Sequence, residues 1–340
     1  MEEQSANEPE RTYLPDTSRA DWLCLSSLVQ YDGMAVAACT ACSCLLSAET
    51  YAMTTAPFFS IITSTYNAAA TLPRLLDSLA VQTCRDFNWI IQDGASSDDS
   101  LKIAESYRDR LPEICVDSRP DKGIYDAWNM ALDRWQDRLG EWILFLGADD
   151  VLAGADVLEH VREILKNCSQ DILFAAGGLI FMNYKSGTAS YPEHPADYTQ
   201  KFRQRFAGMP VRHSALFHKR SILFHKRFNA SFNIFGDYDF ILRTWKSPQQ
   251  LLSLPLLVTI MAAGGISNSP HMKKCYIREK RRCISKNLPF EWRHPCRYVA
   301  LVADAYIWTA KIVLKNFLHQ FATGRFLWCK LQVLHKWMTG

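Results

Sequence analysis

From residue 58 onward the chain alternates between short apolar runs and longer segments in which apolar residues recur every three or four positions. Short runs rich in β-branched and aromatic residues, such as residues 58–63, are typical of strands buried on both faces of a parallel sheet. The longer spacing is typical of helices that pack by one face. The pattern therefore predicts strands over residues 58–63, 87–92, 114–117 and 142–146, with helices from residue 71 and over residues 97–110 and 123–139. This alternation predicts an α/β fold with a mostly parallel sheet flanked by helices.

Beyond residue 151 the pattern is mixed. Strands are predicted over residues 171–181 and 215–218 and a helix over residues 236–245, whereas the stretch from residue 296 is helical, apolar and basic at once. Residues 1–56 are polar and acidic at first, then small and rich in cysteine without clear periodicity. We expect three parts: a poorly ordered N-terminal extension over 1–56 (which an upstream choice of start codon could also produce), a catalytic domain over 57–265, and a C-terminal helical basic extension over 266–340.

The composition excludes several classes of protein. With 48% hydrophobic and 12% aromatic residues among 340, the chain has too many core-forming side chains for a disordered polymer. No uncharged apolar run reaches the roughly 18 residues that cross a bilayer, which excludes a multi-pass membrane protein. The eleven cysteines have no finger-like spacing, and no charged segment followed by an apolar one opens the chain. We therefore expect reduced thiols and a cytoplasmic location.

Polar and acidic residues follow the predicted strands at the point where each strand ends. Residues 63–67, 93–99 and 147–150 lie at such ends, and a fourth acidic cluster follows at residues 236–240. Ligands of open α/β sheets bind outside the carboxyl ends of the strands. Each cluster alone is also compatible with a helix cap or a solvent-facing turn. The adjacent carboxylates at 149 and 150 favour a cation such as Mg²⁺ or Mn²⁺, because without one they repel each other.

The motifs of several common reactions are absent. No Gly-x-Gly-x-x-Gly, Walker or Gly-x-Ser-x-Gly sequence occurs at a suitable strand end. This absence disfavours hydride transfer, P-loop phosphoryl transfer and α/β-hydrolase chemistry.

Five segments, taken in order, resemble the inverting family 2 glycosyltransferases of the GT-A fold. They are FSIIT…YN from residue 59, QDGASSD from residue 92, DKGIYDAWN from residue 121, WILFLGADD from residue 142 and DYD from residue 237. The third segment is most similar to bacterial enzymes that build exopolysaccharide or lipopolysaccharide O-chains, including the colanic-acid type. The resemblance covers about residues 57–245, and five motifs in register argue against chance similarity.

The resemblance implies roles for particular residues. Positions around the nucleoside, with the last one at the uracil of a UDP-sugar, are matched by Thr63, Tyr66, Asn67 and Asp93. The loop and helix that close over the ribose and diphosphate are matched by Asp121, Gly123 and Asn129. A contact to the diphosphate or the acceptor is implied for His213. The acidic motif that holds a divalent metal, Mg²⁺ or Mn²⁺, and with it the donor, is matched by Asp149 and Asp150.

Asp237 matches the acidic position that serves as general base, but the sequence departs from the family twice. The family often carries Asp where Gly147 stands and Glu where Gly236 stands. The first departure leaves two carboxylates, which suffice for a metal, and the second leaves Asp237 and Asp239 as alternatives for the base. The resemblance implies that this base removes the proton of an acceptor hydroxyl, which attacks the anomeric carbon from the opposite face and inverts its configuration.

We therefore predict a metal-dependent inverting glycosyltransferase. It would move a sugar from a nucleotide diphosphate to a hydroxyl of a lipid-linked saccharide in cell-surface polysaccharide synthesis, with no nucleic-acid partner. A sugar-nucleotide pyrophosphorylase is an alternative, disfavoured because residues 63–71 contain neither Gly nor Lys. A non-catalytic GT-A-like scaffold of a polysaccharide assembly complex is another, disfavoured because the acidic residues of all four clusters are present.

Positive charge is concentrated at the end of the chain. The formal net charge is +3, but residues 271–340 hold fourteen Lys and Arg against three acidic residues. A basic cluster at 273–282 precedes apolar and aromatic side chains over 308–328, a combination that suits a helix lying in a membrane interface. Since a lipid-linked acceptor is carried in the cytoplasmic leaflet, we expect peripheral attachment to the inner face of the plasma membrane. The alternative is that this segment packs on the catalytic domain and only its basic residues face solvent.

Overall fold

The computed structural model describes residues 28–31, 34–37, 56–190, 198–263 and 272–288. The chain divides into two compact units, residues 1–54 and 55–340. In the first unit, β1 (Leu28–Tyr31) and β2 (Met34–Ala37) pair antiparallel. The rest of the predicted N-terminal extension, up to residue 55, lies outside the described residues.

The first half of the second unit forms the parallel sheet that the apolar runs predict. Four strands lie in the order β5–β4–β3–β6 and run parallel to one another. Their bounds are Phe59–Thr65 for β3, Phe87–Asp93 for β4, Ile114–Ser118 for β5 and Trp142–Phe145 for β6. They are connected by α1 (Leu72–Ala80), α2 (Ser100–Ser106), α3 (Ile124–Arg134) and the short 3-10 helix η1 (Gln136–Arg138). The carboxyl ends of these strands therefore share one edge of the sheet.

The second half of the unit extends this sheet with mostly antiparallel pairs, which makes the sheet mixed. The order continues from β6 through β10 (Leu216–Lys219), β8 (Phe174–Asn183) and β11 (Leu251–Ala262) to β7 (Val151–Leu152). Only β8 and β11 run parallel in this half, and β9 (Thr188–Ala189) pairs with β8. The described helices here are α4 (Val157–Lys166), α5 (Tyr198–Arg203), α6 (Arg220–His225), α7 (Gly236–Thr244) and α8 (Lys273–Asn287), with the 3-10 turns η2 (His213–Ala215) and η3 (Pro248–Gln250).

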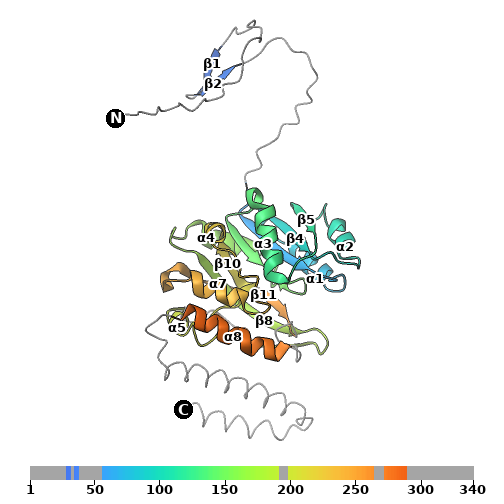
Figure 1. The fold of residues 1–340 in the computed structure, drawn as a ribbon. Helices are drawn as coiled ribbons and strands as arrows, with labels where there is room; N and C mark the ends of the chain where they lie inside the picture. Colours follow the sequence, from blue (N-terminus) through green and yellow to red (C-terminus); the bar gives the residue numbers. More distant parts are fainter. Residues whose placement is uncertain (1–27, 32–33, 38–55, 191–197, 264–271, 289–340) are drawn as a thin grey trace, which may run out of the picture. The chain divides into compact units, whose positions relative to one another are not determined.

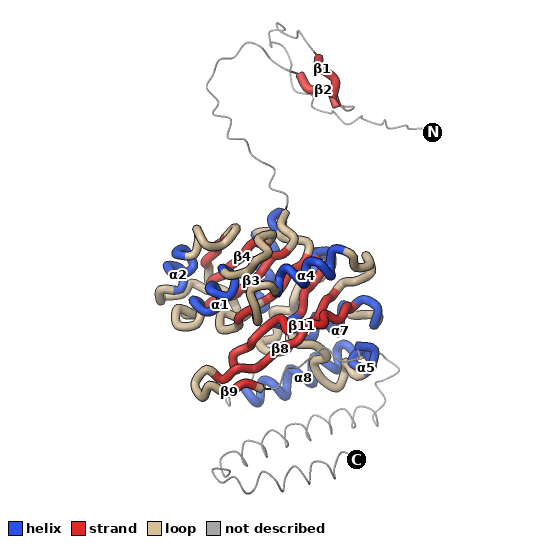
Figure 2. The backbone as a smooth tube through the Cα atoms, turned by 180° about the vertical axis from the view of Figure 1, so that it is seen from behind, coloured by secondary structure: helices blue, strands red, loops and turns tan. Residues whose placement is uncertain are grey.

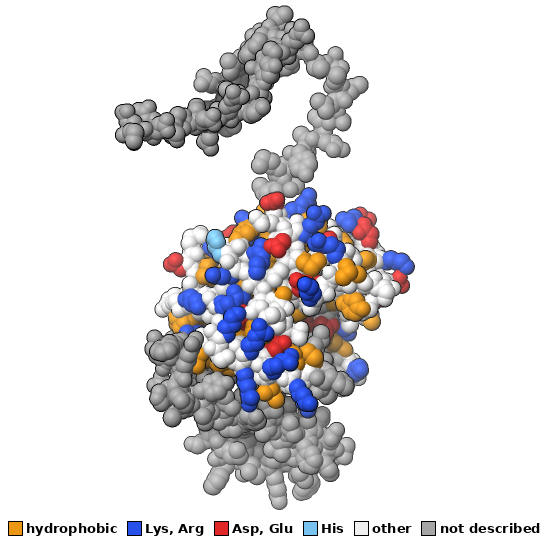
Figure 3. Space-filling model, in the orientation of Figure 1, with side chains coloured by type: hydrophobic (Ala, Val, Ile, Leu, Met, Phe, Trp, Pro, Cys, Tyr) orange, Lys and Arg blue, Asp and Glu red, His pale blue; other side chains and the backbone are white. Residues whose placement is uncertain are grey.

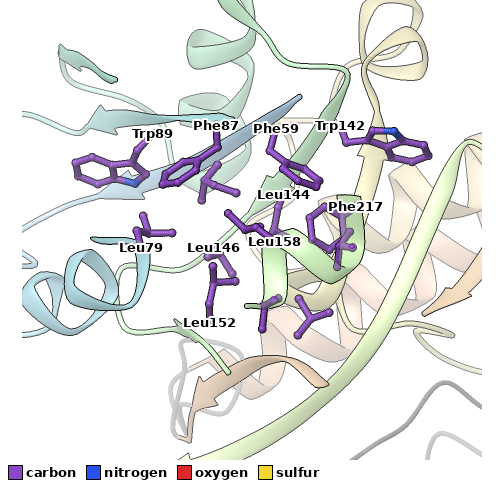
Figure 4. Packing of buried hydrophobic residues seen from close by; sticks show 14 of the residues in the cluster. Phe59, Leu79, Phe87, Trp89, Trp142, Leu144, Leu146, Leu152, Leu158 and Phe217 are labelled. Atoms are coloured by element: carbon purple, nitrogen blue, oxygen red, sulfur yellow. The ribbon is translucent and has the colours of Figure 1, made fainter. Parts of the chain in front are cut away.

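Helices cover both faces of the sheet, and each face has its own hydrophobic cluster (Figure 1). Because side chains alternate along a strand, Ile61 of β3 joins the cluster under α1, α2 and α4, and Ile62 joins the one under α3 and α7. The view from behind in Figure 2 shows the face with α1 and α4. Figure 4 shows part of that first cluster, in which Leu144 and Phe217 of neighbouring strands lie close to Leu158 of α4. The two clusters hold the strand ends, and hence the polar loops that follow them, in fixed positions.

The helix α8 packs against the face of the domain that carries α7. Its Cys283 and Ile284 belong to the same buried cluster as Tyr238 and Ile241 of α7. Over its described part, residues 272–288, the predicted basic extension is thus a helix packed on the domain, while its aromatic stretch over 308–328 lies outside the described residues. Among the described helices, none combines the length and the apolar character needed to cross a bilayer.

The packing of α8 can be tested by removing one buried side chain. We expect Ile284→Ala to lower the free energy of unfolding by about 2–5 kcal/mol, because it leaves a cavity between α8 and α7. The exposed neighbouring change Ser285→Ala is the control and should change it by less than about 0.5 kcal/mol. Chemical denaturation measures both, and equal stability of the two variants would mean that α8 does not pack on the domain.

Candidate active site

Two loops at the carboxyl ends of β3 and β4 are joined by hydrogen bonds. The amide of Asn67 donates to Ser96 Oγ (2.8 Å), and the amide of Ser97 donates to Asn67 Oδ1 (2.9 Å). Asn67 has a φ of 51°, a left-handed conformation that Asn adopts more readily than most residues. Asp98 Oδ2 accepts a further bond from the amide of Ala69 (2.9 Å). The polar residues of these loops therefore fix the rim of the sheet edge rather than only capping helices.

Asp93, at the end of β4, is fully buried and lies at the centre of this network. Its Oδ1 accepts from Thr65 Oγ1 (2.8 Å) and Ser96 Oγ (2.5 Å), and its Oδ2 from the Ser96 amide (2.8 Å) and Ser118 Oγ (2.8 Å). Burial raises the pKa of Asp93, but these hydrogen bonds outweigh it and hold the pKa below the usual value. Both oxygens are thus engaged within the protein, so a contact with uracil requires one hydroxyl to turn away.

The residues predicted to surround the nucleoside at the end of β3 differ in their exposure. Thr63 is fully buried, and its hydroxyl accepts a bond from Trp89 Nε1 (3.1 Å), so its side chain belongs to the core rather than to the edge. Thr65, two residues later on the same face, is the threonine that reaches Asp93. Tyr66 is 71% exposed and Asn67 is exposed beside it. The edge therefore presents Tyr66 and Asn67, with Thr65 beneath them.

The loop before α3 meets the loop after β4. Asp121 Oδ1 accepts from the amide of Gly123 (2.7 Å), and its Oδ2 would lie only 2.8 Å from a Cβ placed on Gly94. Gly123 has a φ of 119°, which favours glycine at the start of α3. Burial, with the charges of Asp126 and Asp93, raises the pKa of Asp121. Asn129 lies elsewhere, since its side chain exchanges two bonds with the backbone of Phe228 (2.9 and 3.0 Å) and so connects α3 to the segment before α7.

Asp149 and Asp150 follow β6 at the same edge. Asp150 is only 2% exposed, and its carboxylate accepts bonds from the amides of Gly147 (3.1 Å) and of Ala262 in β11 (3.3 Å). Burial and the neighbouring charge of Asp149 raise the pKa of Asp150 to about 6, although a contact with Ser214 partly opposes this. In the described part of the chain, neither carboxylate has an ion-pair partner.

These two carboxylates fit a hard divalent cation. Their repulsion and the raised pKa of Asp150 are what a cation would relieve, and oxygen ligands suit Mg²⁺ and Mn²⁺. Within the described residues, no group of three or more His, Cys, Asp or Glu side chains could hold a metal. Such a cation would therefore need further ligands from water or from a substrate, as Mg²⁺ bound to substrate phosphates does.

His213 lies in η2, directly before the Ser214 that contacts Asp150. Its ring stacks on Trp128 of α3, with 4.9 Å between ring centroids, and lies 5.0 Å from the ring of His218. Burial lowers the pKa of His213 well below the usual value, and the ring Nε2 is buried without a hydrogen-bond partner. His213 is therefore a neutral imidazole packed among aromatic rings, one residue before the serine that contacts Asp150.

Asp237 is the second residue of α7 and faces α3. Its Oδ1 accepts from Tyr125 Oη (3.1 Å) and from the amide of Tyr238 (2.7 Å). Burial raises the pKa of Asp237 to about 6, and these two bonds oppose the rise. Gly236 explains one departure from the family pattern, because a Cβ at this position would lie 2.6 Å from the ring of Tyr125. A glutamate at 236 and the observed position of Tyr125 exclude each other.

Asp239, the second candidate base, has a different environment. It is fully buried, it forms an ion pair with Arg243 Nε (2.6 Å), and it accepts from Asn287 Nδ2 of α8 (2.9 Å). A carboxylate held by a cation and an amide inside the fold cannot approach a substrate. The geometry thus favours Asp237 over Asp239 as the base.

Comparison with known proteins agrees with the family resemblance of the sequence motifs. The family described as Glycosyl transferase family 2 matches residues 60–224. A PGL/p-HBAD biosynthesis glycosyltransferase from Mycobacterium bovis is 34% identical over 220 residues, which are 63% of this chain and 80% of that protein. The chain belongs to glycosyltransferase family 2.

Two solved structures are similar to this glycosyltransferase in fold. The mannosyltransferase PcManGT from Pyrobaculum calidifontis, in complex with GDP-Man and Mn²⁺, is similar with a TM-score of 0.51 at 17% identity, over 84% of this chain and 81% of that chain. Residues 1–349 of Staphylococcus aureus TarS, in complex with UDP, give a TM-score of 0.45 at 19% identity over 67% of this chain, which spans 64% of that chain. The similarity to PcManGT confirms the predicted GT-A fold. The relative from Mycobacterium is not named for colanic acid or O-chains, so that finer resemblance stays a prediction.

The sequence reasoning missed several residues that shape this glycosyltransferase's candidate site. They are the hydroxyl groups around Asp93 and Asp150, the tyrosine on Asp237 and a glutamate from α8: Thr65, Ser96, Ser118, Ser214, Tyr125 and Glu279. Most of them lie within the quoted motifs or one residue from a predicted residue, so their position along the chain was a usable signal. Glu279 had no such signal.

The raised pKa of Asp237 predicts an effect on stability that requires no substrate. An acid whose pKa is higher in the folded state binds its proton more tightly there, so stability falls as pH rises from about 4 to about 6. We expect Asp237→Asn to be more stable than the wild type at pH 8, by about 1–3 kcal/mol, with the difference disappearing at pH 4. Thermal unfolding at both pH values measures this, with the exposed Asp109→Asn as control. A destabilised Asp237→Asn at pH 8 would contradict the burial of this charge.

Proposed function

We propose that this glycosyltransferase transfers a sugar, with inversion, from a nucleoside diphosphate to a hydroxyl of a saccharide acceptor, with Asp237 as general base. The observation that carries the proposal is the environment of Asp237, a partly exposed carboxylate whose pKa is raised to about 6 by burial. A base with a pKa near neutrality suits removal of a hydroxyl proton at cellular pH. One displacement by the deprotonated hydroxyl inverts the anomeric carbon, so the chain needs no nucleophile of its own.

The remaining residues of the edge have supporting roles in this proposal. Tyr66 and Asn67 form the exposed rim on which the nucleoside would lie, and Asp93 holds that rim from below. Asp121 and Gly123 border the ribose and diphosphate. The neutral ring of His213 could exchange a hydrogen bond with the diphosphate without adding charge. A UDP-sugar is the favoured donor.

We also propose that Asp149 and Asp150 hold a divalent cation, Mg²⁺ or Mn²⁺. When bound, such an ion supplies positive charge to the leaving diphosphate. The two adjacent carboxylates without a cationic partner among the described residues support this, as does the similar mannosyltransferase from Pyrobaculum calidifontis, whose structure is a complex with GDP-Man and Mn²⁺. The chain's own part is to bury Asp150 and fix it by two backbone amides, so that its oxygens need no rearrangement.

For the acceptor we propose a lipid-linked saccharide of the cell surface, reached at the inner face of the plasma membrane. The feature that supports this location is a row of cations on α8, spaced four residues apart and all exposed: Lys274, Arg278, Arg282 and Lys286. In Figure 3, Lys and Arg side chains are gathered over the part of the surface where α7 and α8 lie in Figure 1. Positive charges on one helix ridge complement an anionic lipid surface, with about 1 kcal/mol per charge near the surface.

The transfer reaction is tested by a donor screen on the full chain. UDP-, GDP- and dTDP-sugars are supplied with Mn²⁺ or Mg²⁺ and a lipid extract, and the release of nucleoside diphosphate is measured. We expect turnover with one donor class, loss of turnover in EDTA, and a kcat about a hundredfold lower or more in Asp237→Asn with little change in donor KM. Asp239→Asn is the matched variant.

We expect the Asn variants of Asp237 and Asp239 to have different effects on turnover and on stability. Asp239→Asn leaves the partly buried Arg243 without its partner, so it should lower stability by about 3–5 kcal/mol while the folded fraction keeps its turnover. A folded but inactive Asp239→Asn beside an active Asp237→Asn would transfer the base role to Asp239. If no donor releases nucleoside diphosphate, the proposed transfer from a nucleotide sugar is wrong.

The membrane location is tested with vesicles. We expect the full chain to bind vesicles of phosphatidylglycerol and phosphatidylcholine at low salt and to release them as salt rises, because the attraction is electrostatic. The triple variant Lys274→Gln, Arg278→Gln, Lys286→Gln should bind at least about tenfold more weakly, since each charge adds about 1 kcal/mol. The control changes three exposed cations elsewhere, Lys102 of α2, Arg110 in the turn after α2 and Lys166 of α4, to Gln. Equal binding by the two triple variants would contradict a role for the α8 ridge.

A further inference from the structure

The helix α8 carries one acidic residue, and this residue is buried. Glu279 is 3% exposed, whereas the cations at positions 278, 281 and 282 are exposed. A buried carboxylate is costly unless hydrogen bonds satisfy its oxygens. Glu279 must therefore have partners inside the fold.

Those partners are the backbone amides of three consecutive residues. Glu279 Oε1 accepts from the amide of Asn233 (2.9 Å), and Oε2 accepts from the amides of Ile234 (2.9 Å) and Phe235 (3.3 Å). The Cys275 thiol, one turn earlier on α8, donates to Oε1 as well (3.2 Å). Residues 233–235 directly precede Gly236 and Asp237, so α8 binds the segment from which the candidate base projects.

The same segment is held from its other side by α3. The single hydroxyl proton of Tyr125 is shared between the carbonyl oxygen of Ile234 (2.6 Å from Oη) and Asp237 Oδ1 (3.1 Å). The peptide that leads into α7 is thus fixed through its N–H groups by Glu279 and through its carbonyl group by Tyr125. Both contacts are polar, and both act on the segment directly before Asp237.

We propose that Glu279 is a positioning residue for the general base, holding residues 233–235 so that Asp237 keeps its half-buried position at the site edge. This inference rests on the proposed function, because it assigns Glu279 a role through Asp237. A loosened segment would let water reach Asp237 and would move its carboxylate away from the acceptor hydroxyl. Misplacement of about 1 Å can lower turnover about a hundredfold.

The test uses Glu279→Gln in the full chain. Whichever way the glutamine amide is turned, its NH₂ group faces at least one backbone N–H that the carboxylate accepted, so the segment must shift. We expect hydrogen exchange of amides 233–235 to become at least about tenfold faster, kcat to fall about ten- to hundredfold, and donor KM to change less than about threefold. Wild-type exchange is measured first, and unprotected amides at 233–235 would overturn the proposal without any variant.

The pH profile supplies a readout that a merely structural role would not change. Among the described residues of the neighbouring helices, Tyr125 of α3 bonds Asp237, the Cys283 thiol of α8 lies within range of its charge, and Glu279 of α8 bonds the segment that precedes it. Since burial raises the pKa of Asp237, exposure should shift the acidic limb of kcat/KM to lower pH. The control Ile284→Ala removes a buried apolar side chain of α8 that carries no charge and no hydrogen-bonding group, so it should lower stability but leave the limb in place.

The outcomes are distinguishable from a failure of the proposed function. If the wild type turns over no nucleotide sugar, the proposed function fails, and faster exchange in Glu279→Gln would still establish the structural part. If the wild type is active and Glu279→Gln keeps its kcat, its acidic limb and its amide protection, the positioning role is wrong. Should Glu279→Gln not fold, Glu279→Asp keeps the charge and withdraws it by one methylene, with the same expected changes in exchange and kcat.

Discussion

The contact between Tyr125 and Gly236 connects the two halves of the catalytic domain at the candidate base. The ring of Tyr125, from the parallel half, lies where any side chain at 236 would stand, and its hydroxyl bonds both Ile234 and Asp237. The geometry of α7 relative to the sheet edge depends on this contact. A larger residue at 236 would displace either α3, which begins at the loop of Asp121, or α7, which carries Asp237.

The carboxylates collected near this edge are stabilised in different ways, and the differences indicate their uses. Asp93 accepts four hydrogen bonds and has a lowered pKa, and Asp239 is paired with Arg243, so both are fully compensated by the protein. Asp150 and Asp237 have raised pKa values because burial is not fully compensated. Groups kept in such a state are those that a cation or a proton transfer can relieve. The electrostatics thus separate residues that organise the site from residues available for chemistry.

The sequence predicted the first half of the fold well because its strands are buried on both faces. Each of β3 to β6 lies within about two residues of a predicted apolar run. The helix expected over 97–110 is shorter, Ser100–Ser106, and it starts later because Ser97 and Asp98 bond the neighbouring loop. Strand β11 escaped prediction since Pro255 interrupts its run, and the structure accommodates this proline at a register shift between Ser253 and Leu257.

The candidate site was predictable only where position along the chain decides contact. Asp149, Asp150 and Asp237 were singled out by their motifs. The threonine that reaches Asp93, however, is Thr65 rather than Thr63, because the position along the strand decides which side chain lies at the edge. The choice between Asp237 and Asp239 depends on the two partners of Asp239. These are Arg243 on the same helix and Asn287 of α8, which is 48 residues away along the chain. The spacing of four residues between Asp239 and Arg243 is visible in the sequence, but the contact with Asn287 leaves no local pattern.

The buried inner face of α8 explains how a helix with so many like charges stays folded. Its exposed row of cations four residues apart is repulsive, and like charges at this spacing destabilise an isolated helix. No exposed acidic residue on α8 offsets the repulsion, since its one glutamate points inward to residues 233–235. The helix therefore depends on its inner face, where Cys283 and Ile284 are buried and Glu279 is bonded, to stay formed. A basic outer face is compatible with a stable helix here only because the inner face is part of the catalytic domain.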